Sequence, residues 1–430
     1  MDTLWNHCLQ RIFRNILFHF RCLIAILNSS GMVSRYILNI YMKIFQYQIL
    51  NVMDANYWCW IFFLFFPQNL AALKRLNLSG CKQLTRIPDL SLALNLEELK
   101  LEGCTSLIEI HSSIQHLNKL VTLNLSDCIC LKSLPTGINL DSLKTLSLAN
   151  CSNFKRFPEV SCNIEVLDMF GTAIEELPSS IGNLSRLETL ALQKCSGLKS
   201  ISSSLCYLKS LRNLYLYRCL KLQKLPAEIG NLESLEFMDA DETAISQVPS
   251  SIACLNRLKK LSFRGCKGRT PQMGLKLPIF FQFQILNELS LIDCGITELP
   301  ESLGQARSLR YLYLDGNNFE KLPSSIKQLS SLLLLTLHNC KRLQSLPELP
   351  YVPNIYARHC TSLETLSNLS TLFGRPPECY QLFDLCNCFK LNQNEVREIV
   401  EEALMKIQVM ATWWKEQDLV TLYISAYTCL

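Results

Sequence analysis

The cysteines are the residues of this sequence with the clearest chemical potential, because thiolates bind metals and form disulfides. The 430 residues include 21 cysteines, and ten of these recur at one position of a repeated phrase, about 23 residues apart. Zinc sites instead use close cysteine pairs, and disulfide-rich scaffolds are small and loop-rich. We therefore interpret the ten as reduced, packed and unreactive thiols, with a metal or disulfide ladder as the alternative. They are Cys81, Cys104, Cys128, Cys151, Cys195, Cys219, Cys266, Cys294, Cys340 and Cys360.

The histidines do not indicate a catalytic or metal site, and the common catalytic motifs are absent from the sequence. His111 and His116 share a predicted turn without a carboxylate pair nearby, and His338 and His359 lie beside cysteines of the recurring set. The sequence contains no G-x-x-x-x-G-K-[ST] phosphate loop, no G-x-S-x-G and no H-E-x-x-H. We therefore expect no catalytic residue, no cofactor and no bound metal, and hence no enzyme.

A short leucine pattern must position the cysteines. Residues 309–323 read LRYLYLDGNNFEKLP, which matches the leucine-rich-repeat signature L-x-x-L-x-L-x-x-N-x-F. On a short strand Leu312 and Leu314 point into a core, and the residues that alternate with them point outward. Asn317 follows the strand, where its amide can bond backbone groups of the turning chain. The ten cysteines occupy the position of Asn317 in other copies.

Thirteen copies of this pattern are present, and one copy cannot bury its own apolar face. The predicted fold is therefore an α/β solenoid, a curved leucine-rich-repeat horseshoe with a parallel inner sheet of about thirteen short strands. The strand centres are Leu76, Leu99, Leu123, Leu146, Leu167, Leu190, Leu214, Met238, Leu261, Leu289, Leu312, Leu335 and Ile355.

Two further features concern the segments between strands. Leu-Pro-Ser-Ser-Ile phrases, as at 177–181, predict short helical or 3₁₀ turns in which a serine caps the turn. The interval from Leu258 to Leu286 is longer than the others by about five residues, and it contains glycines and prolines. This interval predicts an insertion loop between two repeats.

The chain divides into three predicted regions. Residues 1–69 are a hydrophobic lead-in without repeats, whose apolar runs are too short or too interrupted to span a bilayer. Residues 70–369 are the repeat domain, and residues 370–430 start a further domain with a predicted helix from 393. With 49% hydrophobic and 18% charged residues the chain is globular, and its net charge of +5 indicates no nucleic-acid surface.

The repeat phrases resemble a known family. LNLSGCKQLTRIPDLS, LEGCTSLIEIHSSI and LSDCICLKSLP resemble the leucine-rich repeats of plant intracellular immune receptors of the Toll/interleukin-1-receptor, nucleotide-binding class, and the resemblance covers the chain from about residue 70. Residues 382–392, LFDLCNCFKLN, resemble the start of that family's post-repeat domain, which would be truncated here. The family's catalytic and nucleotide-binding domains do not carry over, because residues 1–69 are too short for either.

The resemblance implies a non-catalytic module of a disease resistance protein that senses pathogen effectors or host partners in innate immunity. Its expected location is the cytoplasm, and also the nucleus. One alternative is an extracellular receptor ectodomain, which four Asn-Leu-Ser glycosylation sequons favour, although the sequence has no clear signal peptide. Another alternative is a fragmentary receptor without independent signalling function.

The outward strand positions predict the binding surface, on the concave face of the sheet. Early repeats carry small polar residues there, whereas later repeats carry the aromatic and acidic residues that are common at protein interfaces. We expect a protein ligand whose basic groups complement Asp239, Asp241 and Asp315; the alternative is that strands simply favour tyrosine. The predicted site consists of Phe170, Tyr215, Tyr217, Phe237, Asp239, Asp241, Tyr311, Tyr313, Asp315, Tyr356 and Arg358.

Overall fold

The computed structural model describes most of the chain after its first 66 residues. The described residues are 67–135, 140–158, 162–268, 274–281, 283–367, 382–394, 397–398, 400–401 and 404–405. The chain divides into two compact units, Met1–Phe65 and Phe66–Leu430, and every described residue belongs to the second. The predictions for the hydrophobic lead-in up to residue 66 and for the end of the chain after residue 405 lie outside the described residues.

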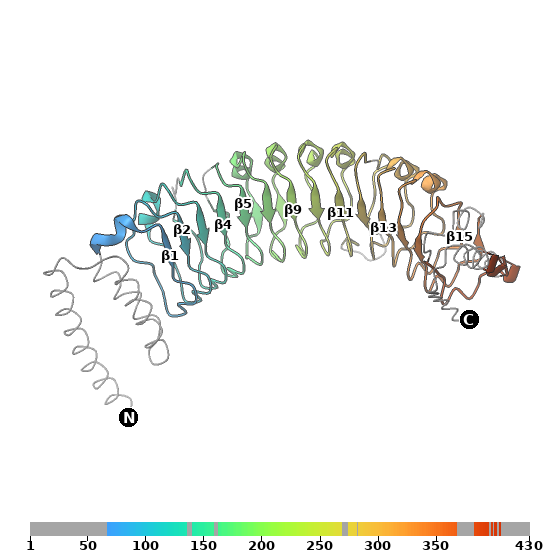
Figure 1. Cartoon of the computed structure of the whole chain (residues 1–430), viewed down its shortest axis with the longest axis horizontal. Helices are drawn as coiled ribbons and strands as arrows, with labels where there is room; N and C mark the ends of the chain where they lie inside the picture. The colour runs from blue at the N-terminus through green and yellow to red at the C-terminus, as the bar shows by residue number, and fades with distance from the viewer. Residues whose placement is uncertain are drawn as a thin grey trace, which may run out of the picture. The chain divides into compact units, whose positions relative to one another are not determined.

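One parallel sheet of fourteen strands runs through the described part of the chain. Figure 1 shows these strands side by side in a single row, in the order of the sequence. The strands are β1 (Arg75–Asn77), β2 (Glu98–Lys100), β3 (Thr122–Asn124), β4 (Thr145–Ser147), β5 (Val166–Asp168), β7 (Thr189–Ala191), β9 (Asn213–Tyr215), β10 (Phe237–Asp239), β11 (Lys260–Ser262), β12 (Glu288–Ser290), β13 (Tyr311–Tyr313), β14 (Leu334–Thr336), β16 (Asn354–Tyr356) and β18 (Leu382–Asp384).

The leucine pattern fixes both the presence and the register of these strands. All thirteen predicted strands are present, and the central residue of each is buried. Neighbouring strands pair without a slip, so that Leu214 lies between Leu190 and Met238. A shift of one residue would turn each central residue to the exposed side. The predicted solenoid of stacked leucine-rich repeats is therefore confirmed.

The fourteenth strand, β18, comes from the segment that the sequence assigned to a further domain. It pairs in parallel with β16, so that Phe383 lies opposite Ile355. Cys388 follows β18 at the same interval as the recurring cysteines follow their strands, and it is buried. The repeat pattern thus continues past residue 369 in structure, while the boundary of the following domain stays a prediction. Residues 393–394, 397–398, 400–401 and 404–405 are helical, where the helix was predicted.

Short 3₁₀ helices precede most of the strands and lie along the edge where the strands begin (Figure 1). They are η1 (Pro67–Ala72), η2 (Ser112–His116), η3 (Ser179–Asn183), η4 (Ser203–Tyr207), η5 (Ile229–Asn231), η6 (Ser250–Cys254), η7 (Glu301–Gln305) and η8 (Ser324–Gln328). Two small parallel pairs complete the turns, β6 (Glu176–Leu177) with β8 (Ser200–Ile201) and β15 (Ser345–Leu346) with β17 (Thr365–Leu366).

The predicted serine caps of the Leu-Pro-Ser-Ser-Ile turns are wrong. In η3, η6 and η8 the cap position is the preceding proline, and no side chain caps the turn. In η6 the second serine instead joins two neighbouring repeats. Ser251 Oγ donates to the Ala227 carbonyl at 2.6 Å and accepts from the Gly230 N–H at 3.2 Å. A local cap was expected because serine often forms one, but here the nearest orphan groups belong to the previous repeat.

The core consists largely of leucines from successive repeats, such as Leu211, Leu214 and Leu216, which are fully buried. Each fully buried leucine contributes roughly 1.5–3 kcal/mol relative to an exposed one. In the described part of the chain, no helix combines the length and the apolar character that crossing a membrane requires.

Candidate functional site

A buried position follows each strand, and we call its residues the slot row. They hold neighbouring repeats together. Cys219 Sγ donates to the Leu192 carbonyl of the previous repeat at 3.1 Å, and nine other cysteines of the row donate in the same way at 2.9–3.3 Å. The row consists of Cys81, Cys104, Cys128, Cys151, Thr172, Cys195, Cys219, Thr243, Cys266, Cys294, Asn317, Cys340, Cys360 and Cys388.

The slot row confirms the predicted position of the cysteines and adds two threonines that the sequence analysis missed. Thr172 Oγ1 donates to the Met169 carbonyl at 3.0 Å and Thr243 Oγ1 to the Ala240 carbonyl at 2.9 Å. Burial raises the pKa of Cys151 to about 12, so this thiol stays protonated and can donate at neutral pH. Asn317 bonds most extensively, since its Nδ2 donates to two carbonyls and its Oδ1 accepts the Ile296 N–H at 3.0 Å.

The residue before each slot has a positive φ in all fourteen described repeats, and we call these residues the left-handed row. Glycine adopts this conformation freely, and Asn and Asp tolerate it, whereas other residues lose about 1–2 kcal/mol. The row consists of Gly80, Gly103, Asp127, Asn150, Gly171, Lys194, Arg218, Glu242, Gly265, Asp293, Gly316, Asn339, His359 and Asn387.

All eleven predicted site residues lie at outward positions of the sheet, and they fall into two clusters. The first cluster, on and just after β5, β9 and β10, contains Phe170, Tyr215, Tyr217, Phe237, Asp239 and Asp241. The second cluster, on and just after β13 and β16, contains Tyr311, Tyr313, Asp315, Tyr356 and Arg358. Tyr215 and Tyr313 are four strand steps apart, about 19 Å. The structure therefore offers two aromatic surfaces where the sequence analysis described one.

One aspartate of each cluster, Asp241 in the first and Asp315 in the second, bonds to the next repeat. Asp241 accepts hydrogen bonds from the Ser262 hydroxyl and, at 2.8 Å, from the Arg264 N–H. Asp315 accepts hydrogen bonds from Thr336 Oγ1 and the His338 N–H, both at 2.6 Å. These carboxylates join repeats in the same way in both clusters. The expectation that a ligand's basic groups complement them stays a prediction.

The two clusters differ in their electrostatic surroundings. Burial, followed by the nearby charge of Asp239, raises the pKa of Asp241 from its usual value of 3.8 to about 6, although the hydrogen bond from Ser262 acts in the opposite direction. In the second cluster, Arg358 Nε lies 2.5 Å from an Asp384 carboxylate oxygen. His338 lies beside Tyr356, with 5.8 Å between ring centroids.

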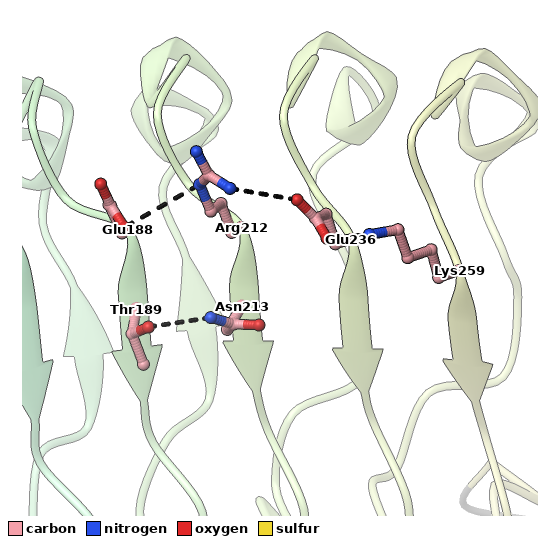
Figure 2. Close-up of polar contacts among 6 residues, drawn as sticks. All are labelled: Glu188, Thr189, Arg212, Asn213, Glu236 and Lys259. Carbon is pink, nitrogen blue, oxygen red and sulfur yellow. Dashed lines mark hydrogen bonds and ion pairs between the residues drawn. The ribbon is translucent and has the colours of Figure 1, made fainter.

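A row of charged residues just before the strands was missed by the sequence analysis. Figure 2 shows Arg212 between Glu188 and Glu236, with closest nitrogen–oxygen distances of 3.8 and 3.3 Å. Lys259 Nζ then lies 2.5 Å from Glu236, which lowers the pKa of that carboxyl group. The signal in the sequence is a charged residue immediately before successive strands. Because acids and bases alternate, these charges compensate one another across the sheet.

The first cluster carries charged side chains from the left-handed row beside its aromatic rings. Lys194 Nζ lies 4.9 Å from the centroid of the Phe170 ring. Arg218 lies 5.3 Å from the centroid of Tyr217, and its Nε is 2.7 Å from a Glu242 oxygen. Among the described residues, no carboxylate forms an ion pair with Lys194. The sequence signal was a charged residue where glycine stands in other repeats.

A groove of about 860 Å³ lies outside the strand rows, beside the predicted insertion. Its lining includes Ile279 and Phe280, which are largely exposed, together with Glu298 and Glu301. Residues 269–273 of the predicted insertion lie outside the described residues. None of the eleven predicted site residues lines this groove.

Comparisons with known proteins agree with the repeat geometry. The family models for a leucine-rich repeat region and for a leucine-rich repeat match residues 190–277 and 308–329. TMV resistance protein N of Nicotiana glutinosa is 40% identical over 66% of this chain and 25% of its own length. Disease resistance protein RPP2B of Arabidopsis thaliana is 41% identical over 80% of this chain and 28% of its own length. The chain thus spans about a quarter of the length of these curated relatives.

Among solved structures, the functional domain of InlJ from Listeria monocytogenes is similar over 75% of this chain and 67% of that chain, with 13% sequence identity and a TM-score of 0.44. The relationship to plant proteins comes from the sequence matches, and the repeat architecture comes from the fourteen strands themselves. The chain is therefore a leucine-rich-repeat protein related to the plant disease resistance proteins of the Toll/interleukin-1-receptor, nucleotide-binding class.

Proposed function

We propose that this chain is a non-catalytic recognition module of plant innate immunity, which binds a pathogen effector or a host protein through the exposed side of its sheet. The observation that carries the proposal is the first cluster, where Tyr215 and Phe237 stand at outward positions of the adjacent strands β9 and β10, and Tyr217 follows β9. Phe237 is 36% exposed. Aromatic side chains on a rigid sheet bury a large area against a partner at a small cost in conformational entropy.

The chemistry of the exposed side supports binding over catalysis. The carboxylates of Asp241 and Asp315 accept hydrogen bonds from neighbouring repeats, and Glu236 is paired with Lys259 and Arg212. Groups held in this way fix the shape of a surface and are poorly placed to transfer protons to a substrate. The relatives' printed names describe disease resistance, and we propose the same process for this chain, inside the plant cell in the cytoplasm and nucleus.

The glycosylation sequons have a structural explanation that supports this location. Asn77 Oδ1 accepts the N–H of Ser79 at 3.0 Å, and Asn124 Oδ1 accepts the N–H of Ser126 at 2.9 Å. An asparagine at the end of a strand thus turns the chain by bonding to the residue two positions later. The Asn-Leu-Ser phrase follows from repeat geometry in these two cases, without glycosylation.

The test is a binding screen of the purified chain against a panel of purified effector and host proteins. Each binder is then measured with the face variant, which combines Tyr215→Ser, Tyr217→Ser, Tyr311→Ser and Tyr313→Ser. We expect affinity to fall roughly a hundredfold or more, because interface aromatics are common hot spots. Circular dichroism and thermal unfolding check that the variant is folded.

The matched control changes exposed aromatics outside the two clusters. It combines Tyr207→Ser and Phe280→Ser, whose side chains are 67% and 69% exposed. We expect the control to bind as the unchanged protein does. Proteins that bind the face variant with unchanged affinity but no longer bind the control would contradict recognition through the sheet.

A further inference from the structure

We propose that the first cluster, rather than the second, anchors the partner, and that the partner presents an acidic side chain to Lys194 next to an apolar group on Phe170 and Tyr217. This inference rests on the proposed function and specifies its site. It assigns binding roles to Lys194, Arg218 and Glu242, three residues of the left-handed row. These residues stand in three successive repeats beside β7, β9 and β10.

The backbone conformation at these positions is set by the sheet, independently of the side chain. The Lys194 N–H donates to the Tyr217 carbonyl at 2.7 Å, and the Arg218 N–H donates to the Asp241 carbonyl at 2.8 Å. These bonds extend the contact between repeats past the end of each strand. The bond needs only the left-handed backbone, with φ of 58° at Lys194 and 60° at Arg218. Glycine would make it with less strain.

Most other repeats place a tolerant residue at this position. Gly, Asn or Asp occupies every other described position of the left-handed row except His359. Only beside the first cluster do three long charged side chains follow one another. Unfavourable backbone conformations tend to persist where a side chain has a function, and here the strained positions coincide with the aromatic surface.

Contacts within the protein do not account for these side chains. The Arg218 and Glu242 side chains are 48% and 38% exposed, so water screens the ion pair between them. Asn150 and Asp127 form the equivalent contact in an earlier repeat at 2.9 Å with residues that tolerate the left-handed conformation. A contact between repeats is therefore available without strained residues.

Among the three residues of the left-handed row at this surface, the charge left without an ion-pair partner is positive. Arg218 has Glu242 as its partner, whereas Lys194 has only the face of the Phe170 ring among the described residues. A partner with a carboxylate for Lys194 and an apolar group for the Phe170 and Tyr217 rings complements this charge and these rings. The second cluster differs, because Arg358 already pairs with Asp384.

The first experiment measures stability and requires no partner. The strain variant combines Lys194→Gly, Arg218→Gly and Glu242→Gly, and the control combines Asp127→Gly and Asn150→Gly. We expect the Tm of the strain variant to rise by a few degrees, because left-handed strain is removed, and we expect a smaller change in the control. A fall in the Tm of the strain variant below that of the control would show that the three side chains support the fold, and would overturn the inference.

The second experiment selects binders from a phage-displayed library of random peptides on the full chain. We expect enriched peptides to combine Asp or Glu with an aromatic or aliphatic residue. Their binding should fall at least tenfold in the strain variant and in Lys194→Gln, and should be unchanged in the control. Retention by Lys194→Arg would confirm that the charge is required.

The outcomes separate this inference from the proposed function. Peptides that lose binding in the face variant but tolerate the strain variant would place recognition on the sheet and overturn the role of Lys194, Arg218 and Glu242. If the enriched peptides bind the face variant and the strain variant as tightly as the unchanged protein, both proposals are overturned. Loss of binding in the strain variant at a raised Tm would support both, because a gain in stability excludes misfolding as the cause.

Discussion

The buried and exposed sides of the sheet are built from alternate residues of the same strands, yet they follow different rules. On the buried side the central strand residue is leucine in most repeats, and the slot row is cysteine in most repeats. On the exposed side the residue next to Leu214 is Tyr215, whereas the residue next to Leu190 is Ala191. A buried side chain must pack against a copy of its own repeat, so a change requires its neighbours to adapt.

This difference shows which side of the sheet carries information about function. The buried side repeats one solution for stacking and therefore says little about a partner. The exposed side is constrained by polar contacts between neighbouring repeats, such as those of Glu188, Arg212 and Glu236 in Figure 2. Departures from the repeat on that side, including the aromatic clusters, are therefore the best guide to binding.

The largest predicted effect contrasts two adjacent residues of β9. Leu214→Ala should lower the free energy of unfolding by about 2–5 kcal/mol, because the cavity cannot be filled by a neighbouring repeat. Tyr215→Ser should change it by less than about 1 kcal/mol, since the side chain is only partly buried. Urea unfolding followed by circular dichroism measures both. Equal losses would remove the distinction between the two sides.

The second prediction compares two members of the slot row. Asn317→Ala should cost roughly 2–4 kcal/mol, because it leaves the Leu291 and Leu314 carbonyls and the Ile296 N–H without the amide. Cys294→Ala should cost about 1 kcal/mol, since it removes one weak thiol donor. Chemical unfolding of the two variants provides the comparison. A greater loss for Cys294→Ala would show that packing, and not hydrogen bonding, decides the slot.

The smallest predicted effect concerns a carboxylate on the exposed side. The pKa of Asp241 is raised from 3.8 to about 6, so the stability linked to this group is present below pH 4 and is lost as the pH rises through 6. Asp241→Asn should therefore be more stable than the unchanged protein at pH 7, by about 1 kcal/mol after allowance for solvent screening. At pH 4 the gain should disappear. Thermal unfolding between pH 4 and 8 measures the difference.

A gain for Asp241→Asn that is the same at pH 4 and pH 7 would contradict this assignment. Asp315→Asn is a suitable control, because Asp315 accepts equivalent hydrogen bonds from Thr336 and His338. It tests whether the pH dependence belongs to Asp241 or to any aspartate that joins two repeats.

Much of the fold followed from local pattern. The alternation at Leu312 and Leu314 predicted both the strand and its buried side, and the interval between copies predicted the stacking. The strand at 382–384 was missed as part of the sheet because its central residue is Phe383, in a segment that resembled another domain. The serine caps were wrong because a Leu-Pro-Ser-Ser phrase does not reveal that the nearest unpaired backbone groups belong to a neighbouring repeat.

The sequence by itself determined which side chains point outward, and therefore the eleven predicted site residues, because a strand alternates its faces whatever surrounds it. Only the tertiary structure decided how those residues are grouped and which charges are already paired. The separation of Tyr215 from Tyr313, the bonds of Asp241 to Ser262 and Arg264, and the place of Lys194 over Phe170 all join different repeats. The physical reason is that parallel strands bring together residues more than twenty positions apart, at distances that depend on register and on backbone conformation after each strand.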